Sequence, residues 1–166
     1  MKNIVISLKT ATARREHIVQ VFGKQNIGFE FFDALTPDLA RPLAEKMQLN
    51  IRDEFLSPGE LACFMSHVSI WQKMVDEHIP HLAIFEDDVY LGNAAAELLN
   101  NAGWINPNWD IIKTEAFADQ VFLGNAQSEI ANGTRHIVQL TGKNLGTAGY
   151  ILSLEGAQKY LEYVKK

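Results

Sequence analysis

The sequence predicts a single α/β domain of 166 residues in which helices flank a mostly parallel central sheet. Three observations predict this class. Short β-branched and aromatic runs alternate along the chain with segments of helical periodicity. The composition, 47% hydrophobic and 21% charged, is that of a globular protein with a substantial core. Finally, no internal repeat, low-complexity stretch or linker divides the chain, so we expect one domain over residues 1–166.

The first third of the chain predicts a β-α-β unit. Residues 3–8 (NIVISL) form a β-branched run, residues 10–25 carry apolar side chains at helical spacing, and residues 29–34 (FEFFDA) form a second apolar run. Strands joined by a helix run parallel, so we expect a parallel sheet here. Residues 37–55 predict a short helix and a loop.

The clearest helix signal begins at the sequence SPGE. Ser57 is a good N-cap, Pro58 suits the first helical position, and Glu60 completes a capping box. The helix is expected to end near residue 78 and to pack on the sheet through a stripe at three-and-four spacing, formed by Leu61, Phe64, Val68, Trp71 and Val75.

The second half continues the alternation of strands and helices. A buried strand (81–85) and an alanine-rich helix (93–102) come first. They are followed by segments that predict strands at 109–115, 120–124, 135–141 and 146–153 and a final helix at 154–166.

Charge and composition exclude several classes of protein. The net charge of −5 argues against a nucleic-acid partner, which requires clustered Lys and Arg. Basic residues near the two ends of the chain are either ordinary solvated charges or make a weak contact with an anionic membrane surface. Because no apolar run approaches the length of a spanning helix, we expect a cytoplasmic protein, with any membrane contact peripheral at the inner membrane. The single cysteine, Cys63, excludes an internal disulfide and a cysteine-rich zinc site, and we expect it to be a small buried core residue.

Three adjacent carboxylates, Glu86, Asp87 and Asp88, follow the buried strand in the sequence HLAIFEDDVYL. Like charges at this density repel each other, which indicates that a cation binds between them. If the backbone stays extended, the side chains of Glu86 and Asp88 point to one side of the strand and that of Asp87 points to the other. The Cα atoms of Glu86 and Asp88 then lie about 6.5 Å apart. Oxygen ligands suit Mg²⁺ or Mn²⁺ together with a diphosphate. The alternative is an acidic turn near a helix N-terminus.

Other catalytic motifs are absent from the sequence. It contains no phosphate-binding P-loop, no G-x-S-x-G elbow and no H-E-x-x-H. The glycines at 142, 146 and 149 are a weak dinucleotide signal because they do not follow the first strand.

Five blocks in order resemble glycosyltransferase family 25, the group of bacterial lipooligosaccharide biosynthesis enzymes that includes β-1,4-galactosyltransferases. The blocks are VISLKTATARR, FFDALTP, LSPGELACFMSHVSIWQKMV, LAIFEDDVYL and GTAGYILS. The resemblance implies a GT-A type fold and an enzyme that moves a sugar from a nucleotide-sugar donor, such as UDP-galactose, to a lipooligosaccharide or other glycan acceptor. It also implies inversion at the sugar carbon. The metal, Mn²⁺ or Mg²⁺, would be held by a D-x-D-like motif, which is EDD in this sequence.

Carried over by position, the resemblance implies that Asp88 is the principal metal ligand. Glu86 then faces the ribose or the water shell of the metal, and Asp87 is the third candidate. Residues at the ends of the first two strands become candidates for donor contacts: Ser7, Leu8, Arg15 and Asp33. For two of these an alternative stays open, a solvated helix charge for Arg15 and a turn cap for Asp33.

Two further groups of candidates follow from helix geometry and the resemblance. Glu60 and His67 share a helix face with Cys63 that could border the donor site, although capping also explains Glu60 and a core position also explains His67. Thr147 and Tyr150 are assigned to the sugar or acceptor side, with plain packing as the alternative for Tyr150. The base is assigned to Glu115 or Asp119, either of which could instead be a surface acid.

Family members continue beyond the last helix of this chain, so we expect the acceptor portion to be partial and a homodimer to cover the exposed apolar surface. Two rival functions stay open. One is a non-catalytic donor-binding module, and the other is a Mg²⁺-dependent phosphoryl-transfer enzyme, which is disfavoured because the acids do not follow the first strand.

Overall fold

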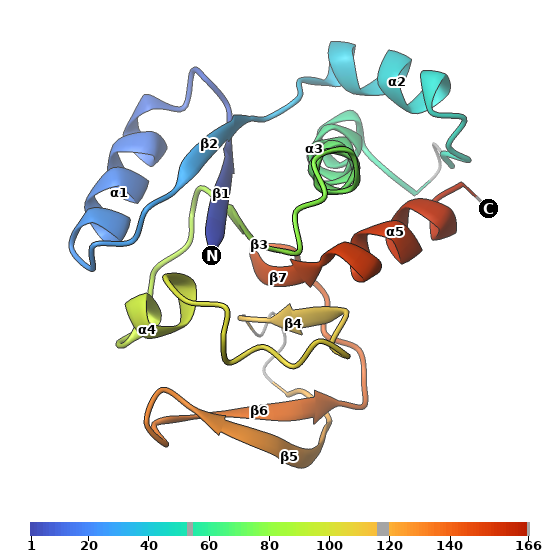
Figure 1. The fold of residues 1–166 in the computed structure, drawn as a ribbon. Coiled ribbons are helices and arrows are strands. Elements are labelled where there is room, and N and C mark those ends of the chain that lie inside the picture. Colours follow the sequence, from blue (N-terminus) through green and yellow to red (C-terminus); the bar gives the residue numbers. More distant parts are fainter. Residues whose placement is uncertain (53–54, 116–119, 166) are drawn as a thin grey trace.

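The computed structural model describes residues 1–52, 55–115 and 120–165 and contains a five-stranded sheet (Figure 1). In spatial order its strands are β2 (Glu30–Asp33), β1 (Lys2–Ser7), β3 (His81–Glu86), β7 (Gly149–Ser153) and β4 (Ile111–Lys113). The α/β class is confirmed. Strand β1 runs parallel to both of its neighbours, as expected, whereas β7 runs antiparallel to β3 and β4.

The sheet is therefore mixed: four of its five strands run in one direction, and the expectation of a mostly parallel sheet fails at β7. Strand β7 is a fully buried run, and a buried apolar pattern carries no information about direction. The chain enters β7 from a β-hairpin rather than from a crossover helix, which leaves it free to run against β3.

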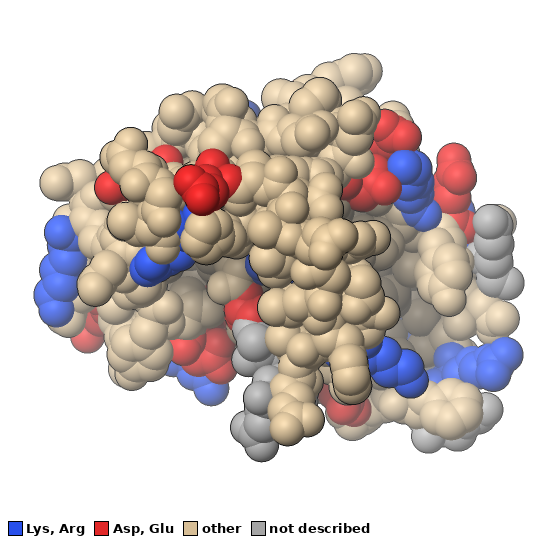
Figure 2. Space-filling model, turned by 90° about the horizontal axis from the view of Figure 1, so that it is seen from below, with Lys and Arg blue, Asp and Glu red and all other residues tan. Residues whose placement is uncertain are grey.

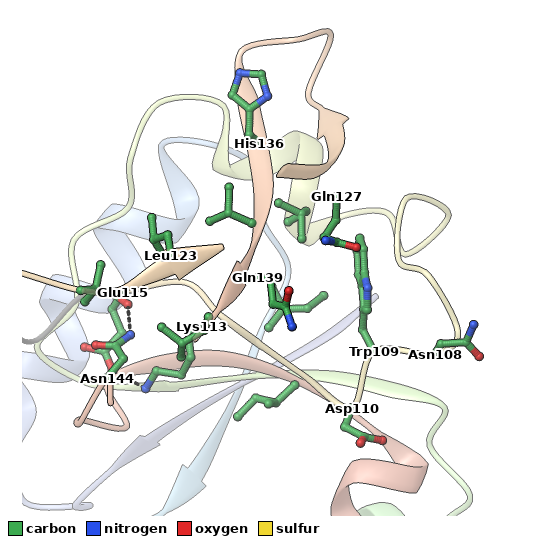
Figure 3. Close-up of a pocket in the computed structure, with 16 residues that line it drawn as sticks. Asn108, Trp109, Asp110, Lys113, Glu115, Leu123, Gln127, His136, Gln139 and Asn144 are labelled. Carbon is green, nitrogen blue, oxygen red and sulfur yellow. Dashed lines mark hydrogen bonds and ion pairs between the residues drawn. The ribbon is translucent and has the colours of Figure 1, made fainter. Parts of the chain in front are cut away.

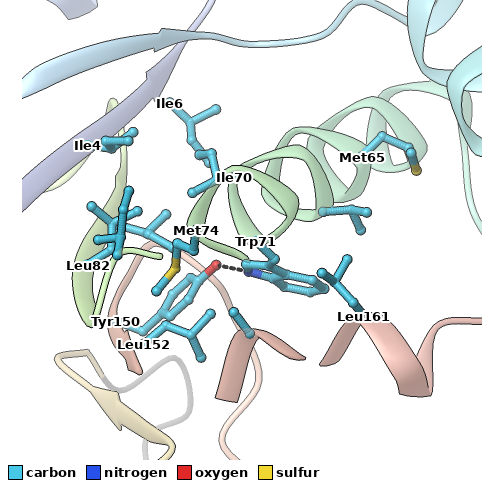
Figure 4. Close-up of a cluster of buried hydrophobic side chains, with 14 of the residues drawn as sticks. Ile4, Ile6, Met65, Ile70, Trp71, Met74, Leu82, Tyr150, Leu152 and Leu161 are labelled. Carbon is cyan, nitrogen blue, oxygen red and sulfur yellow. Dashed lines mark hydrogen bonds between the residues drawn. The ribbon is translucent and has the colours of Figure 1, made fainter. Parts of the chain in front are cut away.

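Two hydrophobic clusters cover the two faces of the sheet. On one face, Val5 and Phe85 pack with helices α1 (Thr12–Gly23) and α4 (Ala95–Leu99). On the other face, Ile4 and Ile84 join a larger cluster that Figure 4 shows. The helices of this second face are α2 (Pro37–Lys46), α3 (Pro58–Asp76) and α5 (Leu154–Tyr163).

The capping box of α3 is confirmed. The Ser57 hydroxyl accepts from the Glu60 backbone N–H at 3.2 Å, and the Glu60 carboxylate accepts from the Ser57 N–H at 2.8 Å. Of the predicted stripe, Phe64 and Val75 are only partly buried. Because α3 packs against α2 and α5 as well as the sheet, its buried surface is broader than one stripe, and its buried residues are Leu61, Ala62, Met65, Ser66, His67, Val68, Ile70, Trp71 and Met74.

A separate antiparallel hairpin lies beside β4, formed by β5 (Leu123–Ile130) and β6 (Arg135–Leu140). The strand expected at 120–124 begins at Leu123 and extends further than predicted. Viewed from this side, the Lys and Arg side chains are interspersed with Asp and Glu rather than gathered into one basic patch (Figure 2). Within the described residues, every helix is too short or too polar to cross a membrane.

Candidate active site at the carboxyl end of β3

Strands β1, β2 and β3 are parallel, so their last residues Ser7, Asp33 and Glu86 lie along one edge of the sheet. The strand β3 ends at Glu86, and Asp87 and Asp88 form a turn. The expected extended backbone through the triplet is therefore wrong. The turn sends the three carboxylates into three different environments.

Asp87 is anchored below the surface by two donors. Its side chain is 9% exposed and accepts from the Ser7 hydroxyl at 2.7 Å and from the Arg14 guanidinium at 2.9 Å. The hydrogen bond to Asp87 raises the pKa of Arg14. Asp87 thus fixes the turn and holds Arg14, 63% exposed, next to the triplet.

Arg14 is a candidate that was not predicted from the sequence, which favoured the neighbouring Arg15. Helical periodicity cannot distinguish the roles of two consecutive arginines that leave one helix in different directions. The available signal was the position of Arg14 in the first turn of the helix that follows β1, since the start of this helix lies near the carboxyl ends of the parallel strands.

Arg15 instead ties the ends of β1 and β2 together. It donates to the backbone oxygens of Ser7 and Leu8 at 2.8 and 3.1 Å and to the Asp33 carboxylate at 2.6 Å. Asp33 also pairs with Lys9 at 3.1 Å, and hydrogen bonds from Arg15 and Lys9 lower its pKa. The four residues predicted from these two strand ends therefore do lie together.

Glu86 is held through one of its two carboxylate oxygens. Oε1 accepts from the Thr147 hydroxyl at 2.5 Å and from the Cys63 thiol at 3.9 Å. The Nε2 atom of His67 lies 3.4 Å from the same oxygen, a contact that falls short of hydrogen-bond geometry. The pKa of Glu86 is lowered, most of all by His67. The hydrogen bond from Thr147 and the charge of Lys113 also lower it, whereas burial raises it.

Cys63 is only partly buried, unlike the core residue expected from the sequence. Its thiol faces the carboxylate of Glu86, and burial, together with the charges of Glu86 and Asp88, raises its pKa to about 11. Glu60 lies one turn earlier, exposed and engaged in the capping box, so the structure does not bring it to the carboxylates.

Buried aromatic residues fix the orientation of the His67 ring on the side opposite Glu86. Its Nδ1 atom lies 2.8 Å from the Tyr150 hydroxyl. This hydroxyl also accepts from the Trp71 indole N–H at 2.9 Å, as Figure 4 shows. Tyr150 is 2% exposed, and burial raises its pKa. The structure thus places Tyr150 in the core behind His67, whereas Thr147 is exposed beside Glu86.

Asp88 is exposed, and its carboxylate makes no hydrogen bond or ion pair with any residue in the described ranges. It is the one member of the triplet that lines a cavity of about 640 Å³, between the end of β3, α4, β4 and the hairpin. Further lining residues are Tyr90, Trp104, Lys113, Glu115, Arg135 and His136.

A second cavity of about 630 Å³ lies between β4 and the hairpin (Figure 3). It shares Lys113, Glu115 and His136 with the first cavity. Its remaining polar wall consists of the indole of Trp109 and the side chains of Asn108, Asp110, Gln127, Gln139 and Asn144. Glu115, a predicted base, pairs with Lys113 at 2.9 Å on the wall common to both cavities. The other predicted base, Asp119, lies outside the described residues.

Comparison with known proteins agrees with the resemblance seen in the sequence. The chain is 39% identical to the lipooligosaccharide biosynthesis protein lic2B of Haemophilus influenzae, over 98% of the chain and 63% of that protein. It is 38% identical to the lacto-N-neotetraose biosynthesis glycosyltransferase LgtB of Neisseria gonorrhoeae, over 98% of the chain and 60% of that protein. The chain thus spans about three fifths of the length of the curated relatives it matches. The family model for glycosyltransferase family 25 (LPS biosynthesis protein) matches residues 1–166, and the chain belongs to this family.

Proposed function

We propose that the chain binds a nucleotide-sugar donor and transfers its sugar, galactose from UDP-galactose, to a lipooligosaccharide or related glycan with inversion. Family membership and the names of the relatives support a glycosyltransferase of lipopolysaccharide biosynthesis. The observation that carries the proposal is the position of Asp88. Its two neighbours are anchored to the protein, whereas Asp88 has no hydrogen-bond partner among the described residues and lies at the wall of a cavity large enough for a nucleotide sugar.

The fold is proposed to be of GT-A type. Three parallel strand ends meet at one edge of the sheet, and the acidic turn follows the central strand of the five. In open α/β sheets, ligands bind outside the carboxyl ends of the strands, so this edge is the expected donor site.

The residues at this edge fit a divalent cation. Asp88 has both carboxylate oxygens free, and Glu86 has Oε2 free of hydrogen bonds within the described residues. Two carboxylates suit Mg²⁺ or Mn²⁺, which complete their shells with water and phosphate oxygens. A bound cation would neutralise the charge that develops on the departing diphosphate.

The other residues bind the donor and receive the proton. The guanidinium of Arg14 would contact the diphosphate, since it lies beside the triplet and is mostly exposed. Glu115 lies where the two cavities meet, and we assign it the role of base. The acceptor hydroxyl attacks the anomeric carbon, its proton passes to Glu115, and the bond to UDP breaks with the electron pair leaving on the phosphate oxygen.

The test is calorimetric titration of the protein with UDP-galactose, with and without Mn²⁺. Because two carboxylates hold a hard cation weakly until phosphate oxygens complete its shell, donor affinity should rise strongly with Mn²⁺. Equal affinity with and without Mn²⁺ would contradict the metal assignment.

Activity assays separate the two rival functions from the proposed one. Coupled Mn²⁺ and donor binding without UDP release, over a panel of truncated lipooligosaccharide acceptors, would indicate the non-catalytic module. Hydrolysis of a simple phosphate ester without any sugar nucleotide would indicate the phosphoryl-transfer enzyme. Self-association stays a prediction, to be measured by light scattering.

A further inference from the structure

We propose that Cys63, His67 and Glu86 form a separate site for a borderline-soft divalent cation of the Zn²⁺ class. Cys63 and His67 lie four residues apart on α3 and therefore on one face of the helix, and Glu86 faces them from the end of β3. The thiol sulfur, the imidazole Nε2 and a carboxylate oxygen all lie within 4.8 Å of one another. This site does not rest on the proposed function, which is carried by Asp88, although the two share the carboxylate of Glu86.

The imidazole of His67 supplies a buried nitrogen, Nε2, that has no hydrogen-bond partner among the described residues and could bind a metal. The residue is 1% exposed, and its Nε2 atom has no hydrogen-bond partner among the described residues although it is directed at Glu86. Burying a polar nitrogen without a partner is unfavourable, so the unpaired atom calls for a ligand. The space in front of it contains the thiol of Cys63 and the carboxylate of Glu86.

The opposite side of the imidazole has the support that metal-binding histidines require. The Nδ1 atom lies 2.8 Å from the Tyr150 hydroxyl, and Trp71 fixes that hydroxyl. A ligating histidine usually forms such a hydrogen bond through its other nitrogen, which sets the ring orientation. Thr147 donates to Glu86 Oε1 and so fixes the carboxylate oxygen that faces His67.

Two of the three separations between the ligand atoms are close to those around a tetrahedral ion, and the third is within 4.8 Å. With Zn–N and Zn–O bonds of about 2.1 Å and a Zn–S bond of about 2.3 Å, tetrahedral angles place N and O about 3.4 Å apart and S and O about 3.6 Å apart. The observed separations are 3.4 Å for His67 Nε2 to Glu86 Oε1 and 3.9 Å for Cys63 Sγ to the same oxygen. Two of the three separations therefore need almost no adjustment.

The ligand set selects the class of metal. Thiolate and imidazole favour Zn²⁺ over Mg²⁺ or Mn²⁺, which prefer oxygen. Three protein ligands leave a fourth position open for water or substrate. Glu86 is 28% exposed and Cys63 is partly exposed, so the ion can reach the site from solvent. Since Glu86 is also a candidate for the Mn²⁺ site, Zn²⁺ bound here would hold that carboxylate against α3.

Cobalt is the spectroscopic probe for this site. The metal-free full chain is titrated with Co²⁺ in the absence of nucleotide, and thiolate-to-cobalt charge transfer is followed in the near ultraviolet. Because Cys63 is the single cysteine of the chain, any such band must come from it. The expected result is one equivalent of Co²⁺ with four-coordinate visible bands, displaced by one equivalent of Zn²⁺. Absence of the charge-transfer band in the folded protein would overturn the proposal.

Variants separate this site from the Asp88 site. Cys63→Ser should abolish the band and lower Zn²⁺ affinity by more than about 100-fold, and Tyr150→Phe should lower it by about 10- to 100-fold through loss of support for His67. Asp88→Asn is the matched control, and it should change Zn²⁺ affinity far less than Cys63→Ser does, because it removes a nearby charge but no ligand. Circular dichroism confirms that each variant is folded. Unchanged Zn²⁺ affinity in folded Cys63→Ser, or equal losses in Cys63→Ser and Asp88→Asn, would contradict the assignment.

Discussion

The guanidinium of Arg14 lies 2.9 Å from the carboxylate of Asp87 and joins the start of α1 to the turn that follows β3. Residues 73 positions apart in the sequence thereby meet beside Asp88, the residue that lines the cavity. The contact leaves Arg14 largely exposed and Asp87 nearly buried, so the arginine is the partner that can also reach a ligand. The neighbouring Arg15 has no such freedom, because its donors are directed at backbone oxygens and Asp33.

Replacing Arg14 by Gln should therefore weaken donor binding. Hydrogen bonds to charged groups contribute about 1.5–3 kcal/mol, so the Kd for UDP should rise by about 10- to 100-fold in titration calorimetry with Mn²⁺ present. Arg15→Gln is the control, and it should lower thermal stability more than UDP affinity. The reverse pattern would return the donor contact to Arg15.

Asp88 and Trp71 should separate function from stability. Asp88→Asn should remove the Mn²⁺ dependence of UDP binding and lower the transfer rate by about 100-fold or more, because it deletes a charge that the transition state requires. The free energy of unfolding without metal should stay the same or rise, since repulsion between neighbouring carboxylates is relieved.

Trp71→Ala provides the opposite case. Trp71 is 7% exposed, stacks on Tyr160 and donates to Tyr150, so its truncation should cost about 3–5 kcal/mol in urea unfolding. Near-normal transfer by Asp88→Asn would remove the central assignment of the proposed function.

Much of the fold could be predicted from local patterns. Hydrophobic periodicity located the strands and helices, and the capping box located the start of α3, because these features depend on residues close together in the sequence. The direction of β7 could not be predicted, since direction is set by the connection that precedes a strand. The turn at Asp87 was also hidden, because Ser7 and Arg14, which hold it, are distant in sequence.

The candidate site was also predicted only in part, because some of its contacts join residues that are distant in the sequence. Parallel strand ends meet at one edge, so Ser7, Asp33 and Glu86 could be brought together from the sequence. The contact between Cys63 and Glu86 could not, because a lone cysteine on an apolar helix is most often a small core residue. Its surroundings are decided by the packing of α3 on β3.

The capping box gives a stability prediction that also tests Glu60. Ser57→Ala should lower the free energy of unfolding by about 0.5–2 kcal/mol, measured by urea denaturation, because the Glu60 N–H loses its acceptor. Glu60→Gln should keep the box, since the amide oxygen can still accept from Ser57. If Glu60→Gln nonetheless weakens UDP binding, the predicted donor contact of Glu60 gains support and capping alone is insufficient.

Asp33 predicts a defined dependence of stability on pH. Hydrogen bonds from Arg15 and Lys9 lower its pKa from an ordinary value of 3.8, so the folded state favours the ionised form. The stabilisation is fully present above the pKa of the unfolded chain and is lost as pH falls through the lower pKa of the folded protein. Urea unfolding of the parent and Asp33→Asn should therefore differ at pH 6 and converge as the pH falls below about 4. A difference that stays constant across this range would exclude the ion pairs as its cause.

The cavity beside β4 predicts where the acceptor binds. The Trp109 indole forms one wall, and the amides of Gln127 and Gln139 provide hydrogen-bonding groups nearby, an arrangement suited to the apolar face and the hydroxyls of a sugar (Figure 3). Because burying an aromatic side chain contributes about 1.5–3 kcal/mol, Trp109→Ala should raise the acceptor KM by about tenfold or more and leave the Kd for UDP unchanged. Trp109→Phe, which retains a ring, should recover part of the loss.

Tyr163→Ala is the matched control for Trp109→Ala, since Tyr163 is an aromatic residue that is 74% exposed on α5 and belongs to neither cavity. It should change neither the acceptor KM nor the Kd for UDP.

Oligosaccharide binding should also quench tryptophan fluorescence in the parent and much less in Trp109→Phe, where only Trp71 and Trp104 remain. An unchanged acceptor KM in folded Trp109→Ala would place the acceptor elsewhere, because a sugar stacked on this indole cannot lose its platform without losing affinity.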